Sequence, residues 1–309
     1  MYLKYKIVFF ILITLIVSCS SNKVKKSDTS NNIKLTNQNI NFSETVELKK
    51  LINILIHPGE VRIFSLKAQP SDDYEVLCGK KNIKSDYYNN RLVFVIAESY
   101  FSKKNAYECY INKDKVRQTL ITVKVNSRKY LHEKLNVDKK RVQLSAKNLK
   151  RYLREKKLLT KKYKLSSQKL MFTKPFTIPL NSKVTSIYGT KRIFNNHKHT
   201  QHLGTDFRAK VGTPIPATNS GKIIFAGDLF FTGGTVIINH GLGIYSIYGH
   251  LSKLLVTENQ KISRGQIVAL SGKSGRVTGP HLHWGLKISG QYIDGISMIK
   301  ESQIFKENE

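Results

Sequence analysis

The second half of the chain alternates short apolar segments with glycine-containing turns. From Phe172 onward each apolar segment is only a few residues long, and no long helical period is found beyond about residue 170. Short segments rich in β-branched and aromatic residues, separated by turn residues, are typical of β-strands. The pattern predicts an all-β domain with tight turns. The predicted strands lie within KVTSIYGT, GKIIFAG, GTVIINHG, GIYSIYGHL, QIVALSG and HLHWGLKI.

Another strand-rich segment, residues 41–127, precedes this domain. Its stretches VRIFSLKA, RLVFVIAE, YECYI and LITVKV carry β-branched and aromatic residues, with turn sequences such as HPGE and YNNR between them. This spacing predicts a small β-sandwich, so the chain as a whole is expected to be mainly β. His57 lies in a turn and is interpreted as a surface residue. Cys78 and Cys109 could form a disulfide, but the sequence does not give their separation.

Residues 128–172 are the most basic part of the chain and are predicted to form a basic helical linker. SAKNLKRYLREKKLLTKKYK begins at Ser145, a residue type that caps helix N-termini, and places Leu149, Tyr152 and Leu153 at helical spacing. One interpretation is a helix that binds an anionic polymer. The favoured one is a solvated connecting helix with one apolar stripe packed on a neighbour, because charged helix faces are usually solvated.

The N-terminus has the features of a secretory signal. Lys4 and Lys6 precede an apolar run over residues 7–17, which is short for a membrane-spanning helix. We therefore interpret residues 1–18 as a lipoprotein signal peptide. The polar residues 19–40 are expected to be a flexible tether.

The end of the apolar run, Ile16-Val17-Ser18-Cys19, resembles a bacterial lipobox. The resemblance implies cleavage before Cys19 and a lipid on that cysteine, which would anchor the protein to a membrane. The alternative is an ordinary signal anchor with a chance cysteine. Ser20 follows instead of an acidic residue, so in a cell with two membranes we expect an exported protein on the outer membrane, facing the periplasm.

The net charge of the chain is strongly positive. It contains 52 Lys and Arg against 21 Asp and Glu, a formal charge of +31. Such a charge predicts attraction to a polyanion such as nucleic acid, anionic lipid or an acidic wall polymer. Export argues against nucleic acid as the partner. The alternative is that the lysine content reflects an AT-rich genome and has no partner behind it.

Four of the nine histidines and one aspartate form the main candidate site. HLGTD contains His202 and Asp206, YGHLS contains His250, and HLH contains His281 and His283. Imidazole nitrogens and carboxylate oxygens are good zinc ligands, and a catalytic zinc typically keeps three protein ligands and one open position. Residues i and i+2 of a strand point to the same face, so the two histidines of HLH can enter one cleft.

The other histidines of this segment, His197, His199 and His240, are interpreted as structural or surface residues. Tyr248, two residues before His250, is interpreted as a packing residue in preference to a residue that lines the cleft.

These motifs together resemble the lysostaphin/LytM-type zinc metalloendopeptidases. The resemblance runs through residues 173–295 and is carried by HLGTD, GTPIPATNSGKIIFAG, INHGLGIYSIYGHLS and RGQIVALSGKSGRVTGPHLHW. It implies an antiparallel β peptidase domain over residues 173–302, of the duplicated hybrid motif or barrel-sandwich hybrid type. It also implies hydrolysis of the peptide cross-links of bacterial peptidoglycan.

Carried over residue by residue, the resemblance gives each candidate a role. His202, Asp206 and His283 correspond to the ligands of one Zn²⁺ ion per chain, and His250 and His281 correspond to catalytic residues that are not ligands. Some family members place a supporting tyrosine upstream of the first ligand. This chain has none there, and Arg192 is the nearby candidate.

The resemblance also implies a mechanism. Zinc lowers the pKa of its bound water towards about 7 and polarises the scissile carbonyl that this water attacks. One imidazole, of His250 or His281, can take the proton of the water, and the other can stabilise the oxyanion and protonate the leaving amine. The sequence leaves open which histidine is the general base.

Two other functions remain as alternatives. Some relatives on the same fold have lost zinc ligands and act as non-catalytic regulators of cell-wall amidases, whereas this chain keeps all five residues. A structural lipoprotein that binds wall polymer would account for the charge but not for the histidines.

Overall fold

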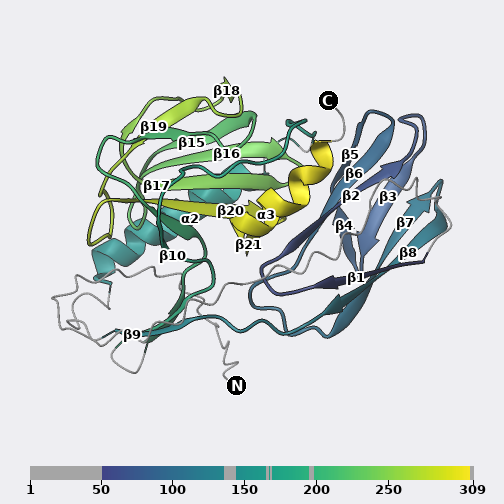
Figure 1. The fold of residues 1–309 in the computed structure, drawn as a ribbon, viewed down its shortest axis with the longest axis horizontal. Helices are drawn as coiled ribbons and strands as arrows, with labels where there is room; N and C mark the ends of the chain where they lie inside the picture. Colours follow the sequence, from purple (N-terminus) through teal and green to yellow (C-terminus); the bar gives the residue numbers. More distant parts are fainter. Residues whose placement is uncertain (1–50, 136–143, 165–166, 168, 195–197, 307–309) are drawn as a thin grey trace, which may run out of the picture.

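The computed structural model describes residues 51–135, 144–164, 167, 169–194 and 198–306, which are mainly β, as the sequence predicts (Figure 1). The predicted signal peptide, Cys19 and the tether lie outside these residues, as does His197. Among the described helices, none has the length and apolar character needed to cross a membrane.

Two sheets that share one core form the N-terminal unit. The five-stranded sheet has the order β1-β8-β7-β3-β4, and the three-stranded sheet has the order β2-β6-β5. Both sheets contribute to the core, for example through Phe64, Val76, Phe94 and Ile121. The strands are β1 (Leu51–Ile56), β2 (Val61–Lys67), β3 (Tyr74–Cys78), β4 (Lys81–Ile83), β5 (Ser85–Tyr88), β6 (Arg91–Ala97), β7 (Ala106–Lys113) and β8 (Val116–Val125).

Cys78 and Cys109 form a disulfide inside this unit. They are directly paired residues of the neighbouring antiparallel strands β3 and β7. The bond therefore joins two strands that already pair, far along the chain from the candidate site.

Strand β6 connects the two halves of the molecule because both of its faces are buried. Leu92, Phe94 and Ile96 face the core of the two-sheet unit, whereas Val93 and Val95 belong to the core of the C-terminal domain. Alternate side chains of a strand point to opposite faces, so a continuous apolar run suits a strand between two cores. Salt bridges reinforce the contact, including Arg62–Glu301 at 3.4 Å and Arg128–Asp294 at 3.0 Å.

The predicted helical linker over residues 128–172 is only partly helical. Helix α2 covers Ala146–Lys164, while β9 (His132–Leu135) is a strand that pairs in parallel with β11 (Lys191–Phe194). The prediction was wrong for β9, because its strand conformation depends on a partner that lies far away in the sequence. β11 also pairs with β12 (Lys198–Gln201).

Helix α2 packs on the C-terminal domain through one side. The N–H of Asn148 donates to the Ser145 hydroxyl at 3.3 Å, as expected of an N-cap. Leu159 and Tyr163 contact a cluster of buried residues of the domain, but Leu153, which we expected in the apolar stripe, is exposed. The result matches the favoured interpretation of a connecting helix packed on a neighbour.

The C-terminal domain is built on a ten-stranded sheet. Its main path is β10-β13-β20-β17-β16-β15-β18; β14 pairs with β19, which also pairs with β17, and β21 pairs with β20. Helix α3 (Gly295–Glu301) and a short 3-10 helix (Ser302–Phe305) lie between this sheet and the two-sheet unit (Figure 1). The strands are β10 (Val184–Ser186), β13 (Thr205–Arg208), β14 (Pro214–Pro216), β15 (Gly221–Leu229), β16 (Gly233–Gly241), β17 (Ile244–Leu254), β18 (Lys261–Ile262), β19 (Ile267–Ser271), β20 (His281–Ile288) and β21 (Gln291–Ile293).

The shared core leads to a prediction about stability. Ile63→Ala should lower the free energy of unfolding by about 2–5 kcal/mol, because Ile63 is buried where β2 meets the C-terminal domain. Both units should still unfold in one transition, measured by denaturant titration. Val116→Ala, at a position 60% exposed, is the control and should change stability by less than about 0.5 kcal/mol. Two separate transitions would contradict this prediction.

Candidate metal centre and catalytic histidines

The pairing of three strands brings the candidate residues together. β20 lies between β13 and β17, and its His283 is paired with Asp206 on one side and with Gly249 on the other. His250 follows Gly249, and His202 lies just before β13. The structure thus gathers all five predicted site residues from three separate motifs, although up to 81 residues separate them.

Three of these residues form a tight cluster. The Asp206 Oδ1 atom lies 3.0 Å from His202 Nε2 and 2.8 Å from His283 Nδ1, and the two ring nitrogens lie 3.2 Å apart. Two ligand atoms bound about 2.0–2.1 Å from a tetrahedral zinc ion lie roughly 3.3 Å apart. The two nitrogens and one carboxylate oxygen therefore fit a zinc ion with small adjustments, and they are the ligand types that zinc prefers.

Hydrogen bonds to Nδ1 fix the orientation of the His202 ring. Its Nδ1 lies 3.1 Å from the Ile187 carbonyl and 3.2 Å from the Ser186 hydroxyl, so Nδ1–H donates there and Nε2 points into the cluster. Arg192 donates to the same hydroxyl at 2.9 Å and pairs with Glu133 of β9 at 3.1 Å. Arg192 therefore supports the candidate ligand His202. Partners of this kind fix the orientation of a ligand ring.

The other two histidines present one free nitrogen each. The Nδ1–H groups of His250 and His281 donate to the carbonyls of Ser274 and Gly279, each at 2.9 Å. These bonds fix the tautomer of each neutral ring and leave Nε2 as the acceptor. The His281 Nε2 atom is buried without a hydrogen-bond partner among the described residues, and it lies 3.8 Å from Asp206 Oδ1. The two rings are neighbours, with centroids 4.7 Å apart.

The backbone of His250 is strained. Its φ is 65°, in the left-handed region that residues other than glycine rarely adopt. Its N–H donates to the Thr232 carbonyl at 2.6 Å, which together with the ring bond to Ser274 holds this conformation. Strain of this kind is typical of functional sites.

Burial sets the charge states at the site. Burial, followed by the repulsion that His283 and His281 exert when they are protonated, lowers the pKa of His250 to about 3, so the His250 ring is neutral at pH 7. Burial opposes the ionisation of Asp206, but His202 and His283 outweigh it and hold its pKa well below the usual value. The cluster is therefore an anionic carboxylate among imidazoles, as a cation site requires.

Sequence comparison identifies the domain. Residues 200–295 match the family model Peptidase family M23. This stretch is an M23 peptidase domain. The match confirms the resemblance that the motifs indicate.

Two curated relatives share this domain but are longer proteins. Peptidoglycan DD-endopeptidase ShyA of Vibrio cholerae is 39% identical over 121 residues, which is 38% of this chain and 28% of that protein. DD-carboxypeptidase/endopeptidase Mpg of Neisseria meningitidis is 33% identical over 117 residues, 38% of this chain and 27% of that protein. The match thus spans less than a third of either relative, 28% and 27%.

A solved structure of a candidate peptidase M23 from Pseudomonas aeruginosa resembles a larger part of the chain. The likeness covers 82% of this chain and 97% of that one, with a TM-score of 0.61 and 26% identity. It therefore extends beyond the M23 domain into the N-terminal part.

Two residues near the candidate catalytic histidines have structural roles. The Tyr248 hydroxyl is fully buried and accepts from the Thr218 N–H at 2.8 Å, so it does not line the cleft. His240 is fully buried too, and its ring lies between the Ser220 carbonyl and the Ser246 hydroxyl. Both interpretations made from the sequence agree with the structure.

Gly204 is a residue of the M23 domain that sequence reasoning missed. A Cβ atom at this position would lie 2.5 Å from His283 Cε1 and 2.8 Å from the Trp284 carbonyl oxygen. A glycine between two candidate ligands in HLGTD was the available signal. The missing side chain lets the His202–Asp206 segment approach the ring of His283.

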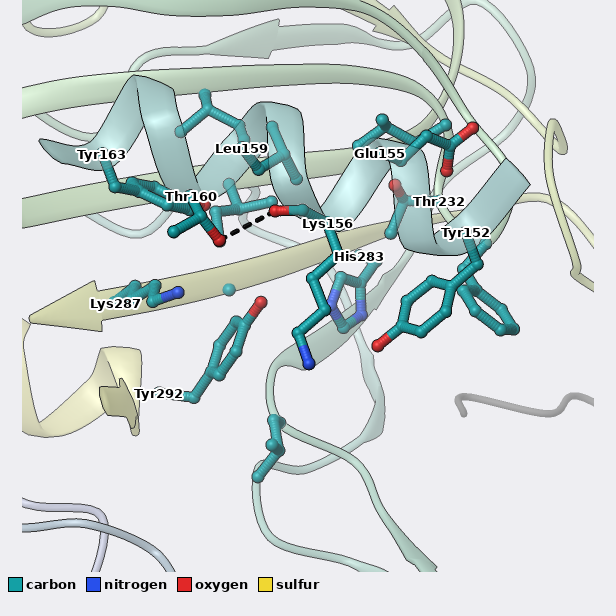
Figure 2. A pocket seen from close by; sticks show the side chains of 16 residues that line it. Tyr152, Glu155, Lys156, Leu159, Thr160, Tyr163, Thr232, His283, Lys287 and Tyr292 are labelled. Atoms are coloured by element: carbon teal, nitrogen blue, oxygen red, sulfur yellow. Dashed lines mark hydrogen bonds between the residues drawn. The ribbon is translucent and has the colours of Figure 1, made fainter. Parts of the chain in front are cut away.

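A pocket of about 270 Å³ lies beside His283, between helix α2 and strand β20 (Figure 2). Helix α2 contributes one wall through Tyr152, Lys156 and Tyr163. The helical part of the linker is thus also part of the wall of the groove beside the candidate site.

The close approach at Gly204 gives a test of the site. Gly204→Ala should weaken zinc binding by about 10- to 100-fold, because the added methyl group displaces His283. Competition with a chromogenic chelator measures the affinity. Gly279→Ala is the matched control, since a Cβ there meets no atom within 4 Å. Equal affinities for the two variants would show that His283 does not need this space.

Proposed function

We propose that this protein is a zinc-dependent endopeptidase that hydrolyses the peptide cross-links of bacterial peptidoglycan. The observation that carries the proposal is the ligand cluster of His202, Asp206 and His283 with two further imidazoles beside it, each with an acceptor Nε2. The names of the M23 relatives support the substrate, since ShyA is a peptidoglycan DD-endopeptidase.

Different residues of the site bind the metal and transfer protons during peptide hydrolysis. Bound zinc would supply a Lewis acid for the scissile carbonyl and lower the pKa of a water molecule. The Nε2 atom of His250 or His281 accepts a proton from the attacking water, whose oxygen bonds to the carbonyl carbon. When the C–N bond breaks, the protonated imidazole returns the proton to the leaving amine.

The surroundings of the two rings assist these transfers. Each Nδ1–H is held by a carbonyl oxygen, so neither ring has to rotate before it accepts a proton at Nε2. Asp206 Oδ1 lies 3.8 Å from the Nε2 of His281, so this proton acceptor stands directly beside the candidate metal ligands.

A regulator of amidases without activity of its own is the other candidate function. A regulator does not require a metal, and nothing would then maintain three ligands at zinc-like separations. The complete cluster and the strained His250 both favour an enzyme.

The enzyme proposal predicts that some substitutions abolish both metal binding and activity, whereas others abolish activity alone. The full chain should release cross-linked stem peptides from purified peptidoglycan, detected by mass spectrometry, and a zinc chelator should abolish this release. His283→Ala should lose both zinc and activity. His250→Asn should retain one zinc per chain and lose activity by about 100-fold or more; asparagine tolerates the left-handed backbone there. A zinc-loaded wild-type chain without hydrolysis would favour the regulator.

We also propose that the protein is exported and anchored to the cell envelope by a lipid on Cys19, with the outer membrane as the expected location. The lipobox resemblance supports this proposal. The wild-type chain should incorporate a labelled fatty acid and fractionate with membranes, and Cys19→Ser should abolish the labelling. Labelling that persists in Cys19→Ser would contradict the anchor.

A further inference from the structure

Two lysines line the pocket beside the candidate metal centre. Lys287 lies on β20, four residues after His283, and Lys156 reaches the same pocket from helix α2 (Figure 2). Alternate residues of a strand share a face, so His283, Gly285 and Lys287 form one row along the groove, with about 13 Å between its end Cα atoms. Gly285 has no side chain to separate the metal centre from the lysines.

Lys287 lies where its ammonium group loses part of its contact with water, which destabilises the charged form. It is partly buried, with its Nζ atom 4.3 Å from the ring centroid of Tyr163 and 5.2 Å from that of Tyr292. The faces of these rings attract the ammonium group, but they do not neutralise its charge as an anion would. Burial and the charge of Lys156 lower the pKa of Lys287 to about 8, so it remains mostly protonated at pH 7.

No carboxylate of the described chain neutralises this pair. Glu155 is the acidic residue that lines the pocket, but one of its oxygens accepts from Arg151 at 2.7 Å and the other from the Phe230 N–H at 2.9 Å. Among the described residues, neither Lys156 nor Lys287 is in a salt bridge. The pocket therefore presents two cations and an aromatic lining without a counter-charge.

We propose that this pocket is a subsite that binds a free carboxylate of the peptide substrate through Lys287 and Lys156. The inference rests on the proposed peptidase function and specifies its substrate class: peptides with a carboxylate about two to four residues from the scissile bond, given the length of the row. A bound carboxylate would neutralise the partly buried Lys287, where a charge-assisted hydrogen bond is strengthened by the loss of water, and the exposed Lys156 would add a second positive charge at the rim of the pocket.

The test uses two synthetic cross-linked peptides that differ only in this carboxyl group, which is free in one and a carboxamide in the other. The wild-type chain should cleave the acid with a kcat/KM about 10- to 100-fold above that of the amide. In Lys287→Met and in Lys156→Met, the preference for the acid peptide should shrink, mainly because kcat/KM for the acid peptide falls. Lys287→Arg should retain part of it. Lys253→Met, an exposed lysine of β17 outside the pocket, is the control.

A binding measurement separates the subsite from the catalytic proposal. Calorimetry with the zinc-loaded His250→Asn chain should show tighter binding of the acid than of the amide, and Lys287→Met in that background should remove the difference. That result without hydrolysis by the wild-type chain would keep the subsite and reject the endopeptidase. The subsite proposal would be overturned if the lysine variants hydrolysed the peptides with an unchanged preference for the acid. It would also be overturned if kcat/KM fell equally for both peptides.

Discussion

The candidate site depends on the pairing of β20 with β13 and β17. This pairing places Asp206 and His283 opposite each other and brings His250 alongside. A slip of one residue would turn His281 and His283 away from the cleft, because side chains alternate between the faces of a strand. The buried neighbours Leu282, Trp284 and Leu286 oppose such a slip, since it would expose them. Core packing and metal geometry are thus determined by the same register.

The same kind of backbone hydrogen bond orients three histidines whose positions around the cluster differ. In His202, Nδ1 is bound to the Ile187 carbonyl and Nε2 points at the other ligands. In His250 and His281, Nδ1 is also bound to a carbonyl, but Nε2 lies beside the cluster and is available for proton transfer. In the proposed mechanism, the same type of side chain therefore serves as a ligand or as a base according to where the backbone places its ring.

The N-terminal part of the chain contributes to the M23 domain in two places. Strand β9 provides Glu133, which pairs with Arg192 and through Ser186 supports the ring of His202. Helix α2 provides one wall of the groove and Lys156 of the proposed subsite. The shared core at β6 holds the two-sheet unit against the domain that it helps to complete. These contacts place the long linker at both the candidate metal centre and the proposed subsite.

The sequence alone determined the mainly β class and the resemblance to lysostaphin/LytM-type peptidases, and it predicted the five site residues, because period-two apolar patterns and closely spaced ligand motifs are local features. The tertiary structure decided what depends on distant partners. Residues 132–135 form a strand only because β11 pairs with them, and Gly204 matters only because His283 folds against it. Lys287 likewise became a candidate for substrate binding only when α2 packed over β20. Such contacts join residues far apart in the chain, so no local pattern records them.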